Sequence, residues 1–187
     1  MDQRHHVFLL AGPSGVGKGT VLAELRSRDP ECWISVSATT RPARPGEIDG
    51  VHYHFVSEEQ FDELVASNQM LEWAVVHGKH RYGTPREPVE QAVREGRIAI
   101  LELDLDGARQ IRKSMPEVYQ IFLKPPSWDE LVHRLRGRGT ESEEQIARRI
   151  ETARTEMAAE SEFDATVVNN SVARATDELL HIMGIDQ

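Results

Sequence analysis

The 187-residue chain contains a single cysteine, Cys32, which excludes an internal disulfide and fits a reducing cytoplasm. Basic residues are the minority: 22 Lys and Arg stand against 31 Asp and Glu, and the formal net charge is −9. Proteins that bind nucleic acid generally need a basic surface for the phosphates, so we expect no nucleic-acid partner. No apolar run approaches the ~20 residues of a membrane-spanning helix, and the short one near the N-terminus lacks signal-peptide architecture. These absences predict a soluble cytoplasmic protein without a membrane partner.

Internal repeats, low-complexity tracts and flexible linkers are also absent from the sequence, and its length fits one domain. Apolar runs typical of buried strands alternate with patterns typical of helices. We predict strands at 7–11, 98–103, 118–123 and 166–168, with helices near 17–28, 107–114 and 172–183. This alternation predicts an α/β fold in which a parallel sheet is flanked by helices.

Three serines are predicted to cap helices, each with a Gln or Glu three residues later that reaches back to the cap. The pairs are Ser57 with Gln60, Ser127 with Glu130, and Ser142 with Gln145. Each pair precedes an apolar stripe at helical spacing, which indicates packing against the core.

Residues 35–96 have a different texture, with turn signals, aromatic residues and short β-like runs such as Val51–Val56. We expect them to form a subdomain inserted into a core of residues 1–34, 97–125 and 156–187. A stretch rich in Arg, Gly and Thr at 134–149 is expected to belong to a lid over residues 126–155. If the helix after Ser127 continues far enough, Arg134 and Arg138 share one of its faces.

The clearest motif is a phosphate-binding loop between the first strand and the first helix. Its glycines let consecutive backbone N–H groups point inward at phosphate oxygens, the helix N-terminus adds partial positive charge, and a lysine adds a full one. We expect ATP to be bound by Gly12, Pro13, Ser14, Gly15, Val16, Gly17, Lys18, Gly19 and Thr20.

One position departs from the usual loop: Gly19 stands where a Ser or Thr commonly offers its hydroxyl to Mg²⁺. We therefore expect Mg²⁺ to enter with ATP and to be held by phosphates and water, without a dedicated protein cage. His52 and His54 alternate along a strand-like run, but no cysteine or carboxylate trio completes a zinc site with them.

Beyond the loop, the sequence resembles the guanylate kinase family from Phe8 to about Asn169. The segment SVSATTRPARPGEIDGVHY at 35–53 is similar to the GMP-binding segment of that family. Further similarities are LEW at 71–73, YGT at 82–84, FLKPPS at 122–127, RLRGRGTE at 134–141 and RR at 148–149.

The resemblance implies direct phosphoryl transfer from MgATP to GMP or dGMP, with no obligatory protein partner. It implies that Ser37, Arg41, Arg44, Tyr53 and Tyr82 bind the GMP phosphate, and that Glu72 and Thr84, with Ser37, read the guanine edge. It also implies that Arg134, Arg138 and Arg149 close over the ATP phosphates beside Lys18. Asn169 is expected near the adenine, and Asp104 with Glu102 is expected to organise Mg²⁺ through water near the GMP site.

Two residues depart from the family pattern: Glu102 stands where Asp is usual, and Asp106 where Gln is usual. By analogy both are expected near the metal and the substrate purine, where they would retune contacts without abolishing activity.

Plainer interpretations remain open at this point. The arginines can belong to a solvated surface, and Glu72 can be a solvated acid. Two other functions also compete. A kinase acting on a sugar phosphate would lack the guanine-reading residues, and a guanylate-kinase-like scaffold module that binds peptides would typically lack an intact phosphate loop.

Overall fold

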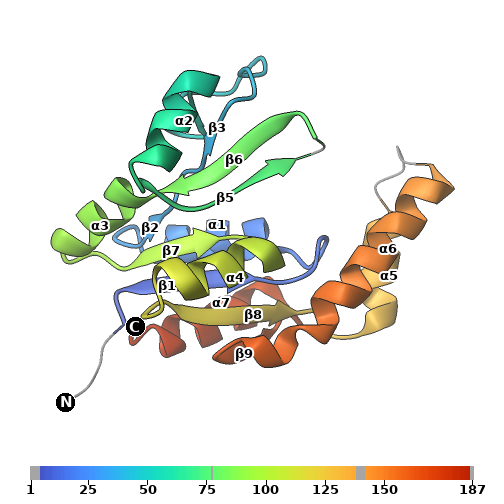
Figure 1. Ribbon diagram of the computed structural model, residues 1–187. Coiled ribbons are helices and arrows are strands. Elements are labelled where there is room, and N and C mark those ends of the chain that lie inside the picture. The colour runs from blue at the N-terminus through green and yellow to red at the C-terminus, as the bar shows by residue number, and fades with distance from the viewer. Residues whose placement is uncertain (1–4, 77, 138–141, 186–187) are drawn as a thin grey trace.

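A computed structural model describes residues 5–76, 78–137 and 142–185. The larger of its two sheets has the strand order β2-β7-β1-β8-β9, and every pair of neighbours is parallel (Figure 1). The strands are β1 (Val7–Ala11), β2 (Trp33–Ile34), β7 (Ala99–Glu102), β8 (Tyr119–Lys124) and β9 (Ala165–Val168). The predicted α/β fold with a parallel sheet is confirmed. Strand β1 has the predicted limits, and the limits of β7, β8 and β9 differ from the predicted ones by at most one residue.

Strand β1 lies in the middle of this sheet and is buried along its whole length. Phe8 and Leu10 point to one face, which is covered by α1 (Lys18–Arg28) and α7 (Val172–Ile182). Val7 and Leu9 point to the other face, where α3 (Arg86–Arg94) and α4 (Leu105–Ser114) pack. A strand buried on both faces reads as a continuous apolar run, which is why the sequence identified β1 so clearly.

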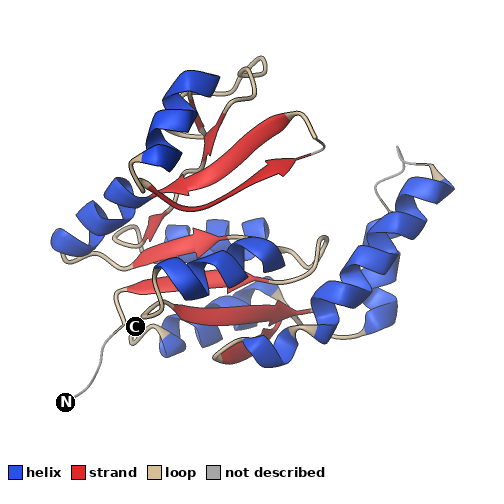
Figure 2. Cartoon of the chain, in the orientation of Figure 1, coloured by secondary structure: helices blue, strands red, loops and turns tan. Residues whose placement is uncertain are grey.

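The second sheet has the order β4-β3-β6-β5 and lies beside the core (Figure 2). It consists of β3 (Ala38–Thr39), β4 (His54–Phe55), β5 (Met70–Val76) and β6 (His80–Pro85), packed against α2 (Glu58–Ala66) through Phe61. All four strands fall within the predicted insert. The β-like run predicted at Val51–Val56 is wrong in extent, because β4 covers only His54–Phe55. Before it, residues 50–52 form a turn, with Gly50 N donating to Tyr53 O, and Tyr53 makes an isolated bridge with Asp49.

Helices α5 (Trp128–Arg136) and α6 (Glu143–Ala158) pack on each other and project beyond the sheet, while a short 3₁₀ helix, η1 (Glu160–Glu162), follows them (Figure 1). Helix α5 ends at Arg136, so it does not carry Arg134 and Arg138 on a shared face, and Arg138 lies outside the described residues. No helix in the described ranges is long and apolar enough to cross a membrane.

The caps were predicted correctly at Ser57 and Ser142, where both halves of the capping box are present. At Ser127 the side chain accepts from Glu130 N, but the return bond predicted for the Glu130 carboxylate is replaced. That carboxylate accepts instead from Arg134 Nε at 3.0 Å, because a guanidinium one turn away is a stronger partner than the cap N–H.

Candidate active site

The phosphate loop follows β1 at the carboxyl edge of the parallel sheet, where α/β proteins bind ligands. Gly17 caps α1 with φ 99°, a left-handed conformation that favours glycine. The Lys18 Nζ curls back and donates to Gly12 O at 2.7 Å, so the lysine closes over its own loop. Burial lowers the Lys18 pKa, and the carboxylates of Glu102, Glu156 and Asp104 oppose that shift.

Side chains from distant segments fix the loop from outside. Asn169 is buried and its Nδ2 donates to Val16 O at 2.8 Å, while Arg134 Nη1 donates to the same oxygen at 3.3 Å. Arg134 therefore contacts the loop directly and does not belong to a solvated basic face. Asn169 serves the loop in this arrangement, and its contact with adenine stays a prediction.

Helix α6 reaches the loop at Ser14 with two side chains of opposite charge. Arg149 Nη2 donates to Ser14 Oγ at 3.0 Å, and Ser14 N donates to Glu156 Oε2 at 3.2 Å. Burial raises the Glu156 pKa. Sequence reasoning missed Glu156, although its spacing of seven from Arg149 places the two on one helical face.

A cavity of about 800 Å³ opens over this loop. It is lined by loop and helix residues that include Ser14, Gly15, Gly17, Gly19 and Thr20, by Arg134, Glu156 and Asn169, and by Lys18, Glu102 and Asp104.

A second cavity, of about 420 Å³, lies between the core and the smaller sheet. Its wall includes Ser37, Tyr53, Glu72 and Tyr82 from the insert, and again Lys18, Glu102 and Asp104. The two cavities therefore share Lys18, Glu102 and Asp104, so ligands in the two would meet at the lysine.

Glu72 supplies the buried acid of the second cavity, with only 7% of its surface exposed. Its Oε1 accepts from Thr84 Oγ1 at 2.7 Å. Burial raises the Glu72 pKa, the bond from Thr84 opposes this, and the charge of Asp104 adds to it. Glu72 is thus no solvated acid. Because the Thr84 hydrogen goes to Glu72, Thr84 orients this carboxylate. The contacts of Thr84 and Ser37 with a bound guanine stay predictions.

Arg41 is held by other side chains of the insert. Its guanidinium makes a two-pronged pair with Glu47 at 2.8 and 3.0 Å, donates through Nε to Tyr82 Oη at 3.1 Å, and lies over the Tyr53 ring. Its side chain is only 10% exposed, so it is no ordinary surface arginine. The bond to Arg41, with one from Arg44 N, lowers the Glu47 pKa to about 2. Glu47 was missed by sequence reasoning.

Known proteins resemble this chain over nearly its whole length. The family model described as guanylate kinase matches residues 4–185. The chain belongs to the guanylate kinase family. A guanylate kinase from Thermobifida fusca is 60% identical over 97% of this chain and 92% of its own length. One from Streptomyces coelicolor is 55% identical over 98% of this chain and 93% of its own length. The crystal structure of guanylate kinase from Anaplasma phagocytophilum matches with a TM-score of 0.73 and 30% identity, covering 98% of this chain and 87% of its own.

The two departures from the guanylate kinase pattern have different surroundings. Glu102 lines both cavities, and its expected place near the metal and the purine stays a prediction. Asp106 does not, because it lies in the first turn of α4 with 83% of its side chain exposed and its carboxylate 3.8 Å from Arg109. The expectation that Asp106 lies near the purine is therefore not supported by this geometry. Arg44 is also exposed, and its backbone N–H contacts Glu47.

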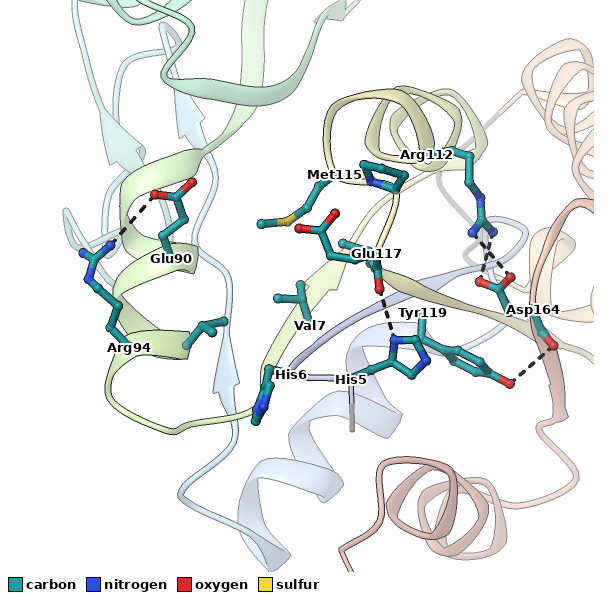
Figure 3. A pocket seen from close by; sticks show the side chains of 13 residues that line it. His5, His6, Val7, Glu90, Arg94, Arg112, Met115, Glu117, Tyr119 and Asp164 are labelled. Atoms are coloured by element: carbon teal, nitrogen blue, oxygen red, sulfur yellow. Dashed lines mark hydrogen bonds and ion pairs between the residues drawn. The ribbon is translucent and has the colours of Figure 1, made fainter. Parts of the chain in front are cut away.

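A third cavity, of about 1140 Å³, lies at the opposite edge of the parallel sheet, where His5, His6 and Tyr119 contribute to its wall (Figure 3). The two arginines in its wall lie beside acidic residues: Arg112 pairs with Asp164 at 3.0 Å, and Arg94 lies beside Glu90. It contains none of the residues that the guanylate kinase resemblance implies.

Proposed function

We propose that this chain transfers the γ-phosphoryl group of MgATP to GMP or dGMP, giving ADP and GDP or dGDP, in the cytoplasm and without an obligatory protein partner. The observation that carries the proposal is the wall shared by the two cavities. ATP in the larger cavity would place its terminal phosphate at Lys18, and GMP in the smaller one would bring its phosphate to the same lysine.

The reaction requires positioning and charge neutralisation more than proton transfer, because the migrating phosphoryl group carries its charge on oxygen. Lys18 lines both cavities, and Arg134 and Arg149 already contact the loop that would hold the ATP phosphates. We assign these three side chains to stabilising the transferred group. The same role is proposed for Arg138, which lies outside the described residues.

Mg²⁺ fits this site as a companion of ATP. Glu102 and Asp104 present carboxylate oxygens, the ligand type that Mg²⁺ prefers, on the wall that both cavities share. In the part of the chain that the structure describes, no group of three or more His, Cys, Asp or Glu could hold a metal ion. We propose that phosphates and water hold the ion, with Glu102 and Asp104 bonded to that water. Bound Mg²⁺ would neutralise phosphate charge.

Base selection follows from the buried Glu72 carboxylate. Guanine presents N1–H and N2–H₂ as adjacent donors, which an acceptor-only carboxylate can bind, while adenine presents an acceptor at N1. Ser37, on the wall of the same cavity, can donate to guanine O6. Arg41, Tyr53 and Tyr82, which are already in contact, would bind the phosphate.

An ADP-release assay with MgATP and GMP, dGMP, AMP, CMP or UMP as acceptor tests the proposal. We expect high kcat/KM for GMP and dGMP and values for the other three lower by about 10⁴. Comparable rates with all five acceptors would contradict the assignment of the guanine pocket. No ADP release with any of them would favour a scaffold module.

A further inference from the structure

Helix α4 contacts the strand that carries Glu72 through the side-chain amide of Gln110. The backbone N of Trp73 donates to Gln110 Oε1 at 3.1 Å, and Gln110 Nε2 donates to Trp73 O at 3.1 Å. Strand β5 ends the sheet order, so it has an outer edge whose backbone groups need partners. Gln110 occupies that edge as a neighbouring strand would, and it fixes the backbone directly after Glu72.

The backbone directly before Glu72 is held from the same helix. The pairing of β5 with β6 shifts register between Met70 and Glu72, and such irregularities redirect side chains next to functional sites. Leu71 lies inside this irregularity, and its carbonyl oxygen accepts from Ser114 Oγ at 2.6 Å. Both chain neighbours of Glu72 are therefore bonded to α4.

The first turn of α4 approaches the Glu72 carboxylate itself. A Cβ placed on Gly107 would lie 3.4 Å from Glu72 Oε2 and 3.3 Å from Asp104 Oδ1. Gly107, Gln110 and Ser114 are spaced three and four residues apart, so they share one face of the helix. Since Asp104 caps the same helix, α4 connects the guanine-reading acid to the wall shared by both cavities.

We propose that Gln110 is a positioning residue for guanine recognition, which acts by holding the β5 backbone so that the Glu72 carboxylate keeps its place in the pocket. The inference rests on the proposed function of Glu72. A reading carboxylate displaced by about 1 Å can cost roughly 100-fold in productive geometry, so the support of its backbone has a measurable effect on selectivity.

Gln110→Leu tests this, because leucine removes both bonds at similar volume. Each neutral hydrogen bond changes an equilibrium constant by a factor of about 2–12. We therefore expect kcat/KM for GMP to fall roughly 10-fold, mainly through a higher KM. The KM for MgATP should stay within twofold. The Glu72 carboxylate gives adenine no hydrogen bond, so the ratio of kcat/KM for GMP over AMP should fall by at least the same factor as kcat/KM for GMP.

Arg109→Ala is the matched control. Arg109 precedes Gln110 on α4, is half exposed, and pairs with Glu162 at 2.6 Å, so its loss weakens the anchoring of α4 without touching β5 bonds. The GMP/AMP ratio should be unchanged in this variant. Thermal unfolding of both variants shows whether each is folded. If Gln110→Leu does not fold, Ser114→Ala replaces it and should lower the same ratio severalfold.

A reduced ratio in Gln110→Leu beside an unchanged ratio in Arg109→Ala supports the inference. An unchanged ratio in Gln110→Leu, or an equal fall in both variants, overturns it. A parallel assay of Glu72→Gln distinguishes failure of the reading role of Glu72 from failure of the positioning role of Gln110. If Glu72→Gln leaves the ratio intact, the reading role of Glu72 and this inference both fail. If Glu72→Gln lowers the ratio and Gln110→Leu does not, only the positioning role fails.

Discussion

Replacing Glu72 by Gln changes one atom in the buried pocket and reverses its hydrogen-bonding character. In the native chain Thr84 donates to Glu72 Oε1, while Oε2 lies toward Gly107. In the variant the amide oxygen keeps the bond from Thr84, because an NH₂ group cannot accept it. The amide nitrogen then takes the other position and presents donors where the guanine N1–H and N2–H₂ groups need an acceptor.

The magnitude follows from two losses. A hydrogen bond to a charged group contributes about 1.5–3 kcal/mol, and leaving a buried donor unpaired costs about 1–3 kcal/mol more. Together these predict a fall in kcat/KM for GMP of about 10²–10⁴-fold. Adenine N1 is an acceptor and loses a repulsive partner, so kcat/KM for AMP should not fall.

The stability of the folded state should not decrease in Glu72→Gln, in contrast to its activity with GMP. Burial raises the Glu72 pKa, so above pH 4.5 the folded state binds more protons than the unfolded state and native stability decreases as pH rises through the raised pKa. A neutral amide removes this cost. The urea midpoint of Glu72→Gln at pH 7 should therefore equal or exceed that of the native chain. Steady-state kinetics with GMP and AMP, together with urea unfolding, test both expectations. An unchanged GMP/AMP ratio in a folded variant would refute the reading role.

Further substitutions separate the other parts of the site. Lys18→Ala should abolish transfer while far-UV circular dichroism stays native, because the loop takes its shape from glycines; near-normal turnover would remove the phosphate-loop assignment. Arg149→Ala should lower kcat by about 10³ or more with little change in the KM for GMP, and a modest KM effect alone would argue for a merely structural contact. Arg41→Ala should weaken GMP binding roughly 10–100-fold in calorimetry with binding of an ATP analogue unchanged; equal weakening of both would contradict the division of the cavities. The Glu47 pKa of about 2 is below the ordinary 4.5, so its stabilising pair is present above pH 4.5 and is lost as pH falls toward 2. Glu47→Gln should reduce that pH dependence of the urea midpoint, and identical profiles would show that the pair does not contribute.

The features that could be predicted from the sequence are those that depend on a local pattern of residues. Strand β1 is an unbroken apolar run, and the loop after it needs glycines at fixed positions, so both could be predicted. The capping box at Ser57 was readable for the same reason, since its partner is three residues away.

Other features depend on contacts that no local pattern encodes. Glu156 meets Ser14 across 142 positions, and Gln110 meets Trp73 across 37. Glu47 is six residues from Arg41, but both a solvated acid and a paired one fit that spacing. The resemblance to the family led us to expect Asp106 near the purine, but its side chain is exposed. A resemblance in sequence identifies a position and does not determine where the side chain at that position points.

We expect a phosphoryl group to pass directly from ATP to GMP at the wall shared by the two cavities. The most direct test follows a mixture of MgATP, GMP and the purified chain by phosphorus NMR. Direct transfer predicts that GDP and ADP appear in equal amounts, without inorganic phosphate, and that neither appears with Lys18→Ala. Release of inorganic phosphate without GDP would contradict the account.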